Sequence, residues 1–259
     1  ALLEAGIDAV AVFSQGAAQH AGALDFAALQ AAVETPAVMQ AYAAITPDTH
    51  AKYLLTSGST GQPKVVINTH RMLCANQQMI AQAWRFLAHE KPVVLDWLPW
   101  SHTFGGNHNF NMVLAHGGSL AVDEGRPAPG LIEKTVANLG EVRPNFYFNV
   151  PRGLALLLPF LERDAAFASA FFEQLEGIFY AAAALPQSLW ERIVAVARSA
   201  RSRPLWFTSA WGATETAPAV TSVHWPIDRA GCIGAPLPGV ELKFVPNGSK
   251  LELRVRGPN

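Results

Sequence analysis

The chain has 259 residues, of which 15% are charged, and its formal net charge at pH 7 is −1. A balance this close to zero indicates neither nucleic acid nor an anionic membrane surface as the partner. No apolar stretch reaches the roughly 18 residues of a membrane-spanning helix. The low share of charged residues predicts a large buried core. Cys74 and Cys232 lie far apart and outside any metal-binding spacing, which predicts free thiols in a reducing, cytoplasmic compartment.

Strand-like apolar runs alternate with helical periodicity along most of the chain. Strands are predicted at 9–13, 53–55, 65–68, 93–98, 118–122, 145–149, 176–180 and 204–208. Helices are predicted at 70–88, 107–116, 130–140, 151–163 and 186–200, and the Ala-rich residues 24–45 are ambiguous. Strands joined by helical crossovers predict an α/β fold with a mainly parallel sheet that is layered with helices.

After Val220 the pattern changes to short alternating runs around the turn sequence "PNG". This pattern predicts a small antiparallel β-unit at the C-terminal end. We therefore predict two parts, with residues 1–219 as the α/β part and residues 220–259 as the start of a β-rich subdomain. The chain does not begin with Met and stops directly after a strand-like run, so we expect a fragment of a longer protein.

The stretch "TSGSTGQPK" (56–64) lies between two strand-like runs and is rich in Gly, Ser and Thr. Backbone N–H groups without bulky side chains form an anion-binding concavity, and Lys64 adds a positive charge for phosphate. The stretch departs from the P-loop of NTPases, because Gly58 and Gly61 are three positions apart and a strand-like run follows Lys64. On its composition alone, a hairpin tip of small residues is the simpler explanation.

Five stretches, in the same order, resemble motifs of the adenylate-forming superfamily, which includes acyl-CoA and aryl-CoA synthetases, luciferases and the adenylation domains of peptide synthetases. They are "YLLTSGSTGQPKVVINTH" (53–70), "DWLPWSHTFGG" (96–106), "FYAAAALP" (179–186), "WGATE" (211–215) and "GCIGAPLPGVELKFV" (231–245). Within the superfamily, the wording of these stretches is most similar to that of bacterial feruloyl-CoA synthases. The resemblance implies that the chain is part of the large N-terminal domain of such an enzyme.

The resemblance implies a binding site for ATP. The residues implied to embrace the β- and γ-phosphates are Thr56, Ser57, Gly58, Ser59, Thr60, Gly61 and Lys64. Ala182 and Ala183 are implied to lie beside adenine, although their segment lacks the family's usual glycines and proline. Trp211 is implied to stack on the base, with Gly212 next to it. Thr214 is implied to bind the α-phosphate.

Glu215 is implied to hold Mg²⁺, which prefers oxygen ligands shared between phosphates and few carboxylates. His102 matches the histidine of the family's acyl-pocket motif and is implied to lie beside the substrate carboxylate. A carboxylate oxygen is already anionic, so we expect His102 to orient and shield the substrate rather than to abstract a proton. His70 and His108 are expected to be structural. Two asparagines, Asn107 and Asn109, are expected either to bind substrate oxygens or to cap the helix that follows them.

The resemblance implies an AMP-forming acid–thiol ligase that converts a carboxylic acid to acyl-AMP and then to a CoA thioester. Aromatic residues in the pocket-linked stretches favour a planar hydroxycinnamate such as ferulate as the acid. These residues are Trp97, Trp100, Phe104, Phe179, Trp206 and Phe207. We expect polar neighbours such as Asn107 and Ser209 to meet ring hydroxyl or methoxy oxygens.

Three alternatives stay open: a domain that loads a carrier-protein thiol, a medium- or long-chain fatty acyl-CoA synthetase, and a non-catalytic nucleotide-binding remnant. The stretch from Pro99 to Gly106 lacks the acid with which amino-acid-loading domains bind an α-amine. Assembly into a homo-oligomer is also left open. The family's ribose-binding Asp and the catalytic Lys of its C-terminal domain are expected beyond Asn259, so we expect the fragment alone to be inactive.

Overall fold

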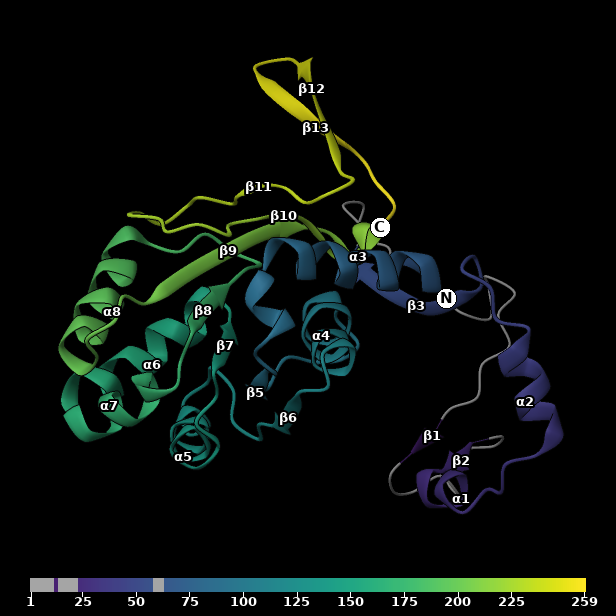
Figure 1. Cartoon of the computed structure of the whole chain (residues 1–259), viewed down its shortest axis with the longest axis horizontal. Coiled ribbons are helices and arrows are strands. Elements are labelled where there is room, and N and C mark those ends of the chain that lie inside the picture. Colours follow the sequence, from purple (N-terminus) through teal and green to yellow (C-terminus); the bar gives the residue numbers. More distant parts are fainter. Residues whose placement is uncertain (1–11, 14–22, 58–62) are drawn as a thin grey trace. The chain divides into compact units, whose positions relative to one another are not determined.

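A computed structural model of the protein describes residues 12–13, 23–57 and 63–259 (Figure 1). The chain divides into two compact units, Ala1–His70 and Arg71–Asn259. The first unit holds a short parallel pair, β1 (Val12–Phe13) and β2 (Leu24–Asp25), and the helices α1 (Phe26–Gln30) and α2 (Pro36–Ala43). It ends in the antiparallel hairpin of β3 (His50–Ser57) and β4 (Pro63–Thr69), whose strands are longer than the two predicted runs.

The second unit is an α/β structure. Its helices are α3 (His70–Ala83, which begins at the unit boundary), η2 (Arg85–Ala88), the π-helix η3 (Phe104–Phe110), α4 (Asn111–Ala115), α5 (Ile132–Val142), α6 (Pro151–Arg163), α7 (Ala165–Glu173), α8 (Gln187–Ala200) and η4 (Thr214–Thr216). Its strands are β5 (Val93–Asp96), β6 (Ser119–Val122), β7 (Phe146–Asn149), β8 (Gly177–Tyr180), β9 (Trp206–Gly212), β10 (Ala219–Ser222), β11 (Ala235–Pro236), β12 (Glu241–Asn247) and β13 (Lys250–Arg256).

The main sheet has the strand order β11-β10-β9-β8-β7. Strands β7, β8 and β9 are parallel, whereas β10 runs antiparallel to both β9 and β11. Strands β5 and β6 form a separate parallel pair, and β12 and β13 form an antiparallel hairpin. The predicted α/β class is confirmed, with a mixed rather than mainly parallel main sheet. Strands β10 and β11 join the main sheet, whereas β12 and β13 pair with each other in a separate sheet. The predicted division into two parts at residue 220 stays a prediction.

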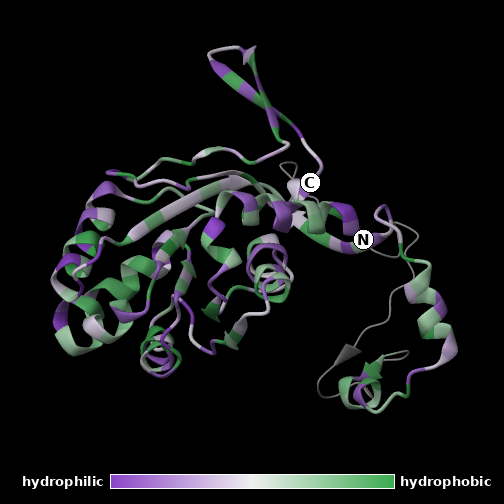
Figure 2. Ribbon diagram, in the orientation of Figure 1, coloured by the Kyte–Doolittle hydropathy of each residue, from purple (hydrophilic) through white to green (hydrophobic). Residues whose placement is uncertain are grey.

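Side chains that alternate along the central strands divide the core into two layers. Tyr147 of β7 packs in one cluster with the leucines of α6 and the phenylalanines of α7, while its neighbours Phe146 and Phe148 pack in the other cluster with α3 and α4. On β8, Ile178 and Phe179 divide in the same way. In Figure 2 helices of the second unit alternate between hydrophobic and hydrophilic colours along their length, and α5, α6 and α8 each have buried residues on one side.

Two helical features differ from the predicted elements. The helix α7 was not predicted, although Asp164 caps its start by accepting a 2.9 Å hydrogen bond from Phe167 N. The predicted helix at 107–116 is divided between the π-helix η3 and the short α4. Gly105 shows why η3 needs small residues, because an added Cβ would lie 2.6 Å from the carbonyl oxygen of Leu98.

Candidate functional site

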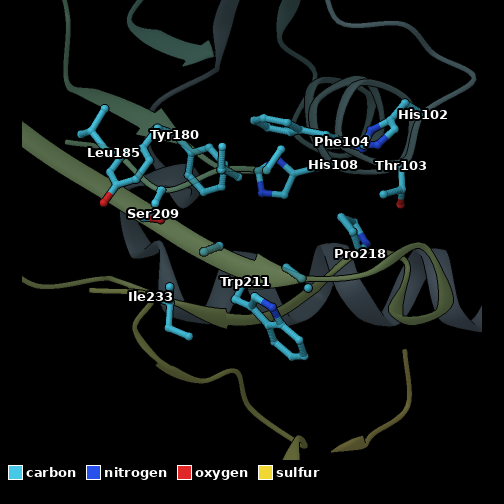
Figure 3. A pocket seen from close by; sticks show the side chains of 18 of the residues that line it. His102, Thr103, Phe104, His108, Tyr180, Leu185, Ser209, Trp211, Pro218 and Ile233 are labelled. Atoms are coloured by element: carbon cyan, nitrogen blue, oxygen red, sulfur yellow. The ribbon is translucent and has the colours of Figure 1, made fainter. Parts of the chain in front are cut away.

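A cavity of about 430 Å³ lies where β8 and β9 end and β10 begins (Figure 3). Because β10 runs antiparallel to β9, its first residues lie at the same edge of the sheet as the last residues of β9. Ligands of open α/β sheets bind beyond the carboxyl ends of the strands. One group of lining residues comes from the segment 102–108, a second from 179–185, a third from 209–212 and 218–219, and a fourth is Gly231 and Ile233.

The segment after β8 forms the part of the cavity predicted to take adenine. Residues Ala181 to Ala184 all line it, and so do Trp211 and Gly212 at the end of β9. Ala182 adopts a left-handed backbone with φ of 71°, which glycine adopts without strain and alanine at a cost of about 1 kcal/mol. The indole of Trp211 is half-buried, and its backbone N–H donates to Thr221 Oγ1 at 3.2 Å.

The segment that begins at His102 forms the part predicted to take the carboxylic acid. The side chain of His102 is exposed, and its Nδ1 accepts a 3.2 Å hydrogen bond from Phe104 N. Figure 3 shows His102, Phe104 and His108 on one side of the cavity, across from Trp211 and Ile233. Ser209, on β9, also lines the cavity and is buried. The arrangement therefore brings a histidine and apolar rings together with the predicted adenine side.

His108 lines the cavity although its sequence pattern gave it no functional role. Its ring is 1% exposed and lies 4.9 Å from the ring of Phe179 in a stacked arrangement. Burial lowers the pKa of His108 to about 4, against a smaller opposite effect of its hydrogen bond with Asn109. Its sequence signal is its position six residues after His102 and two after Gly106, in the segment that forms the π-helix.

Two further residues of the second unit, Thr214 and Glu215, are predicted to bind the α-phosphate and Mg²⁺, and neither is among the residues that line this cavity. Thr214 and Glu215 belong to η4, which begins two positions after Gly212, the last residue of β9 that lines the cavity, and the side chain of Glu215 is exposed. Among the described residues, no group of three or more His, Cys, Asp or Glu side chains gathers in a way that would hold a metal ion. A single exposed carboxylate fits Mg²⁺ that takes most of its ligands from phosphates and water.

The predicted phosphate loop is described only at its ends. Gly58, Ser59, Thr60 and Gly61 lie outside the described residues. Thr56 and Ser57 end β3, and Lys64 is the second residue of β4, paired in register with Thr56. The side chain of Lys64 is exposed. Thus the hairpin geometry brings the two ends of the predicted loop to neighbouring strands.

Buried amides of α3 support two walls of the cavity. Asn76 donates from Nδ2 to the carbonyl oxygen of Ala219 at 2.7 Å, and its Oδ1 accepts from Ala219 N at 3.2 Å. Gln77 donates from Nε2 to the carbonyl oxygen of Asn107 at 2.8 Å. Because Ala219 lines the cavity and Asn107 precedes His108, α3 fixes both the start of β10 and the π-helix.

The two asparagines of the π-helix bind protein groups and do not line the cavity. Asn107 donates from Nδ2 to Thr103 Oγ1 at 3.0 Å. Asn109 donates from Nδ2 to Asp96 Oδ2 at 2.7 Å. Neither of them caps α4, whose N-cap residue is Phe110. Their predicted role toward substrate oxygens therefore has no support in this arrangement.

The six predicted pocket aromatics divide by position. Phe104 and Phe179 line the cavity, and Trp206 lines a second cavity of about 720 Å³ that is also bounded by Trp84, Phe86 and Trp225. Phe207 packs in the core cluster of α6 to α8. Trp97 donates from Nε1 to Asn149 Oδ1 at 3.2 Å, and Trp100 is 50% exposed.

Residues 4–259 match the model of the AMP-binding enzyme family. The chain belongs to this family. It is 28% identical over 224 residues to a long-chain-fatty-acid–CoA ligase of Escherichia coli O6:H1, and 27% identical over 217 residues to a mitochondrial malonate–CoA ligase of Xenopus laevis. These matches cover 83% and 79% of this chain, but only 37% and 35% of the relatives. The chain thus spans little more than a third of their length.

Among solved structures, the family member is similar to a malonyl-CoA ligase in a ternary product complex with methylmalonyl-CoA and AMP. The two share 30% sequence identity and superpose with a TM-score of 0.67, over 83% of this chain and 45% of the other. In the described part of the family member, no helix is both long and apolar enough to cross a membrane.

Proposed function

We propose that the protein is an AMP-forming ligase that joins a carboxylic acid to the thiol of CoA. Membership of the AMP-binding enzyme family supports the use of ATP. The observation that carries the proposal is that one and the same cavity is lined by the small-residue segment Ala181–Ala184 with Trp211 and by His102 with Phe104. A nucleotide and an acyl group that share such a cavity are held close enough to react.

In the proposed reaction, a carboxylate oxygen attacks the α-phosphorus of ATP and the bond to the bridging oxygen breaks, which releases pyrophosphate. The sulfur of CoA then attacks the acyl carbon, loses its proton, and AMP leaves. We assign Thr214 to the α-phosphate and Lys64 with its loop to the outer phosphates. His102 is assigned to the orientation of the carboxylate. When bound, Mg²⁺ would neutralise phosphate charge, with Glu215 as its protein ligand.

An aromatic acid, such as a hydroxycinnamate, is the proposed substrate class. The acyl side of the cavity presents Phe104, Phe179 and the neutral ring of His108, and no Lys or Arg lines the described cavity. A dicarboxylic acid such as malonate would place a second negative charge there without a cationic partner, which is costly in a buried site. A long alkyl chain would meet the ring of Trp84, which packs against Phe179 with 5.6 Å between the two ring centroids.

A panel of acids tests the proposal with the full-length protein. Pyrophosphate release and CoA thioester formation would be measured with ferulate, cinnamate, malonate and palmitate. We expect kcat/KM to be highest for ferulate. Release of pyrophosphate without transfer to CoA would favour the loading of a carrier-protein thiol. A preference for palmitate or malonate would overturn the aromatic assignment and keep the ligase chemistry, whereas no release with any acid would overturn the ligase itself.

A further inference from the structure

The imidazole of His108 is a polar group set into an aromatic wall. Its ring centroid lies 4.9 Å from that of Phe179, 5.7 Å from that of Phe148, 5.8 Å from that of Trp84 and 5.9 Å from that of Phe104. A phenyl ring can make aromatic contacts of the same kind. The two ring nitrogens are what distinguish histidine from phenylalanine in this position, so their hydrogen-bond partners indicate what the residue does.

One nitrogen of His108 is fixed by a short relay. The carboxylate of Asp96 accepts from Asn109 Nδ2 at 2.7 Å, which turns Asn109 Oδ1 toward His108 Nδ1 at 2.9 Å. Because an amide oxygen only accepts, Nδ1 of His108 must carry the proton and donate. The neutral ring then presents a lone pair, and no proton, at Nε2. Burial of the ring, which lowers its pKa to about 4, agrees with this neutral tautomer.

The second nitrogen has no hydrogen-bond partner in the described part of the chain. Nε2 of His108 is buried, and the residue belongs to the cavity lining (Figure 3). Buried polar atoms in native proteins are paired as a rule with a protein group, a water molecule or a ligand, so an unpaired one in a cavity wall is a place where a bound ligand can supply the partner. The group that pairs with a lone pair at Nε2 is a hydrogen-bond donor.

We propose that Nε2 of His108 accepts a hydrogen bond from a hydroxyl group on the acyl part of the substrate. This inference rests on the proposed function and assigns the chemistry that the acid carries away from its carboxylate. The hydroxyl of a hydroxycinnamate is such a donor on a flat ring that suits the neighbouring phenylalanines. A wall with a buried acceptor rejects an acid that cannot donate, because that acid leaves the acceptor unpaired.

The test compares two acids of equal size in the full-length protein. The acids are 4-hydroxycinnamate, which donates, and 4-methylcinnamate, which does not. For the wild type we expect kcat/KM to favour the hydroxy acid by about tenfold to a hundredfold, as for one buried hydrogen bond. His108→Phe keeps the ring and removes the acceptor, so the ratio should fall to about one. With His108→Gln, which returns an acceptor atom on a flexible side chain, part of the preference should be retained.

The matched control is Phe148→Leu, which disturbs the same aromatic cluster and leaves the hydrogen-bonding atoms in place. It should lower both rates and keep their ratio. A second measurement, the ¹⁵N signals of the His108 ring, does not depend on turnover or on any variant. In the free protein we expect Nδ1 protonated and Nε2 bare, and addition of 4-hydroxycinnamate should shift Nε2 whereas 4-methylcinnamate should not.

The outcomes separate the inference from the proposed function. An unchanged ratio in His108→Phe, or an Nε2 signal that ignores 4-hydroxycinnamate, would overturn the role of His108 while adenylation stands. Activity with palmitate, but with neither 4-hydroxycinnamate nor 4-methylcinnamate, would also overturn the role of His108 and leave adenylation standing. If no carboxylic acid releases pyrophosphate, the ligase proposal itself falls. Should His108→Phe fail to fold, His108→Gln and the ¹⁵N signals of the wild type still decide the inference.

Discussion

Asn109 donates from Nδ2 to Asp96 Oδ2 over 2.7 Å, and the same side chain holds His108 Nδ1 at 2.9 Å from its Oδ1. One amide therefore joins two buried titratable groups. Burial raises the pKa of Asp96 to about 6, although the hydrogen bonds from Asn109 and Leu98 N act in the opposite direction. Burial lowers the pKa of His108 to about 4.

These two pKa shifts have opposite effects on stability between about pH 4 and 6. The native state holds the proton of Asp96 up to a higher pH than the unfolded chain, whose value is 3.8, so this stabilisation is lost as the pH rises through 6. The unfolded chain protonates His108 already near 6.5, so the stability that the neutral ring contributes is lost as the pH falls through 4. Each slope reaches about 1.4 kcal/mol per pH unit, and they largely cancel.

Single substitutions should expose the two slopes separately. In His108→Phe, only Asp96 remains, and the free energy of unfolding should decrease as the pH rises from about 4 to about 6. In Asp96→Asn, only His108 remains, and the free energy of unfolding should decrease as the pH falls over the same range. Urea unfolding at a series of pH values measures both. If the free energy of unfolding of both variants depended on pH as that of the wild type does, the opposite contributions of Asp96 and His108 would be contradicted.

Gly106 should not tolerate a methyl group. Its added Cβ would overlap the carbonyl oxygen of Trp100, a backbone atom that cannot move aside cheaply. Gly106→Ala should therefore destabilise the protein by about 1–3 kcal/mol, as overpacking does. Gly140→Ala is the matched control, because Gly140 lies inside α5 and its added Cβ would meet no atom within 4 Å apart from its chain neighbours and the nearby backbone of its own helix. It should stabilise the protein by up to about 1 kcal/mol, and thermal unfolding of both variants measures the contrast.

Trp84 should limit the length of the acid. Its ring contacts His108 and Phe179 on the side of the first cavity, and it lines the second cavity together with Trp206. Trp84→Leu should cost about 3 kcal/mol of stability. It should also raise kcat/KM for 4-butoxycinnamate relative to cinnamate, because the inner rings gain room to move back.

Trp100→Leu is the control for Trp84, because Trp100 is half-exposed and outside the cavity lining. It should leave the ratio for the two acids at its wild-type value. An unchanged ratio in Trp84→Leu, with a folded variant, would place the limit on acid length elsewhere.

Lys64 should serve ATP more than AMP, because we assign it to the outer phosphates. A hydrogen bond to a charged group contributes about 1.5–3 kcal/mol. In the full-length protein, Lys64→Ala should therefore weaken ATP about tenfold to a hundredfold and leave AMP nearly unchanged. Lys52→Ala, in the neighbouring strand of the same hairpin, is the comparison variant. Equal losses for both nucleotides, measured by calorimetry, would contradict the assignment.

The sequence motifs single out several residues that line the cavity, but not His108, which lines it too. Trp211, Ala182 and His102 line the cavity and lie in short contiguous motifs, whereas their roles toward ligands stay predictions. The helix α6 was predicted with its observed bounds because its apolar spacing is regular. The π-helix was not predictable in this way, since it depends on the close approach of Gly105 and Gly106 to the backbone of residues 98–100, which no periodicity of side chains reveals. Because the π-helix was not predicted, the sequence offered no reason to predict that His108 lines the cavity.

The antiparallel return of β10 has a consequence for the order in which the chain folds. The hairpin of β9 and β10 closes over the short turn 213–218, whereas Ala219 is held by Asn76, which lies 143 positions earlier. Short loops close at little entropic cost and long ones later, once other contacts have formed. During refolding, pulse-labelled hydrogen exchange should therefore find the amide of Trp211 protected before that of Ala219. The cavity would then be completed late, when the helix bearing Asn76 docks on a hairpin that already exists.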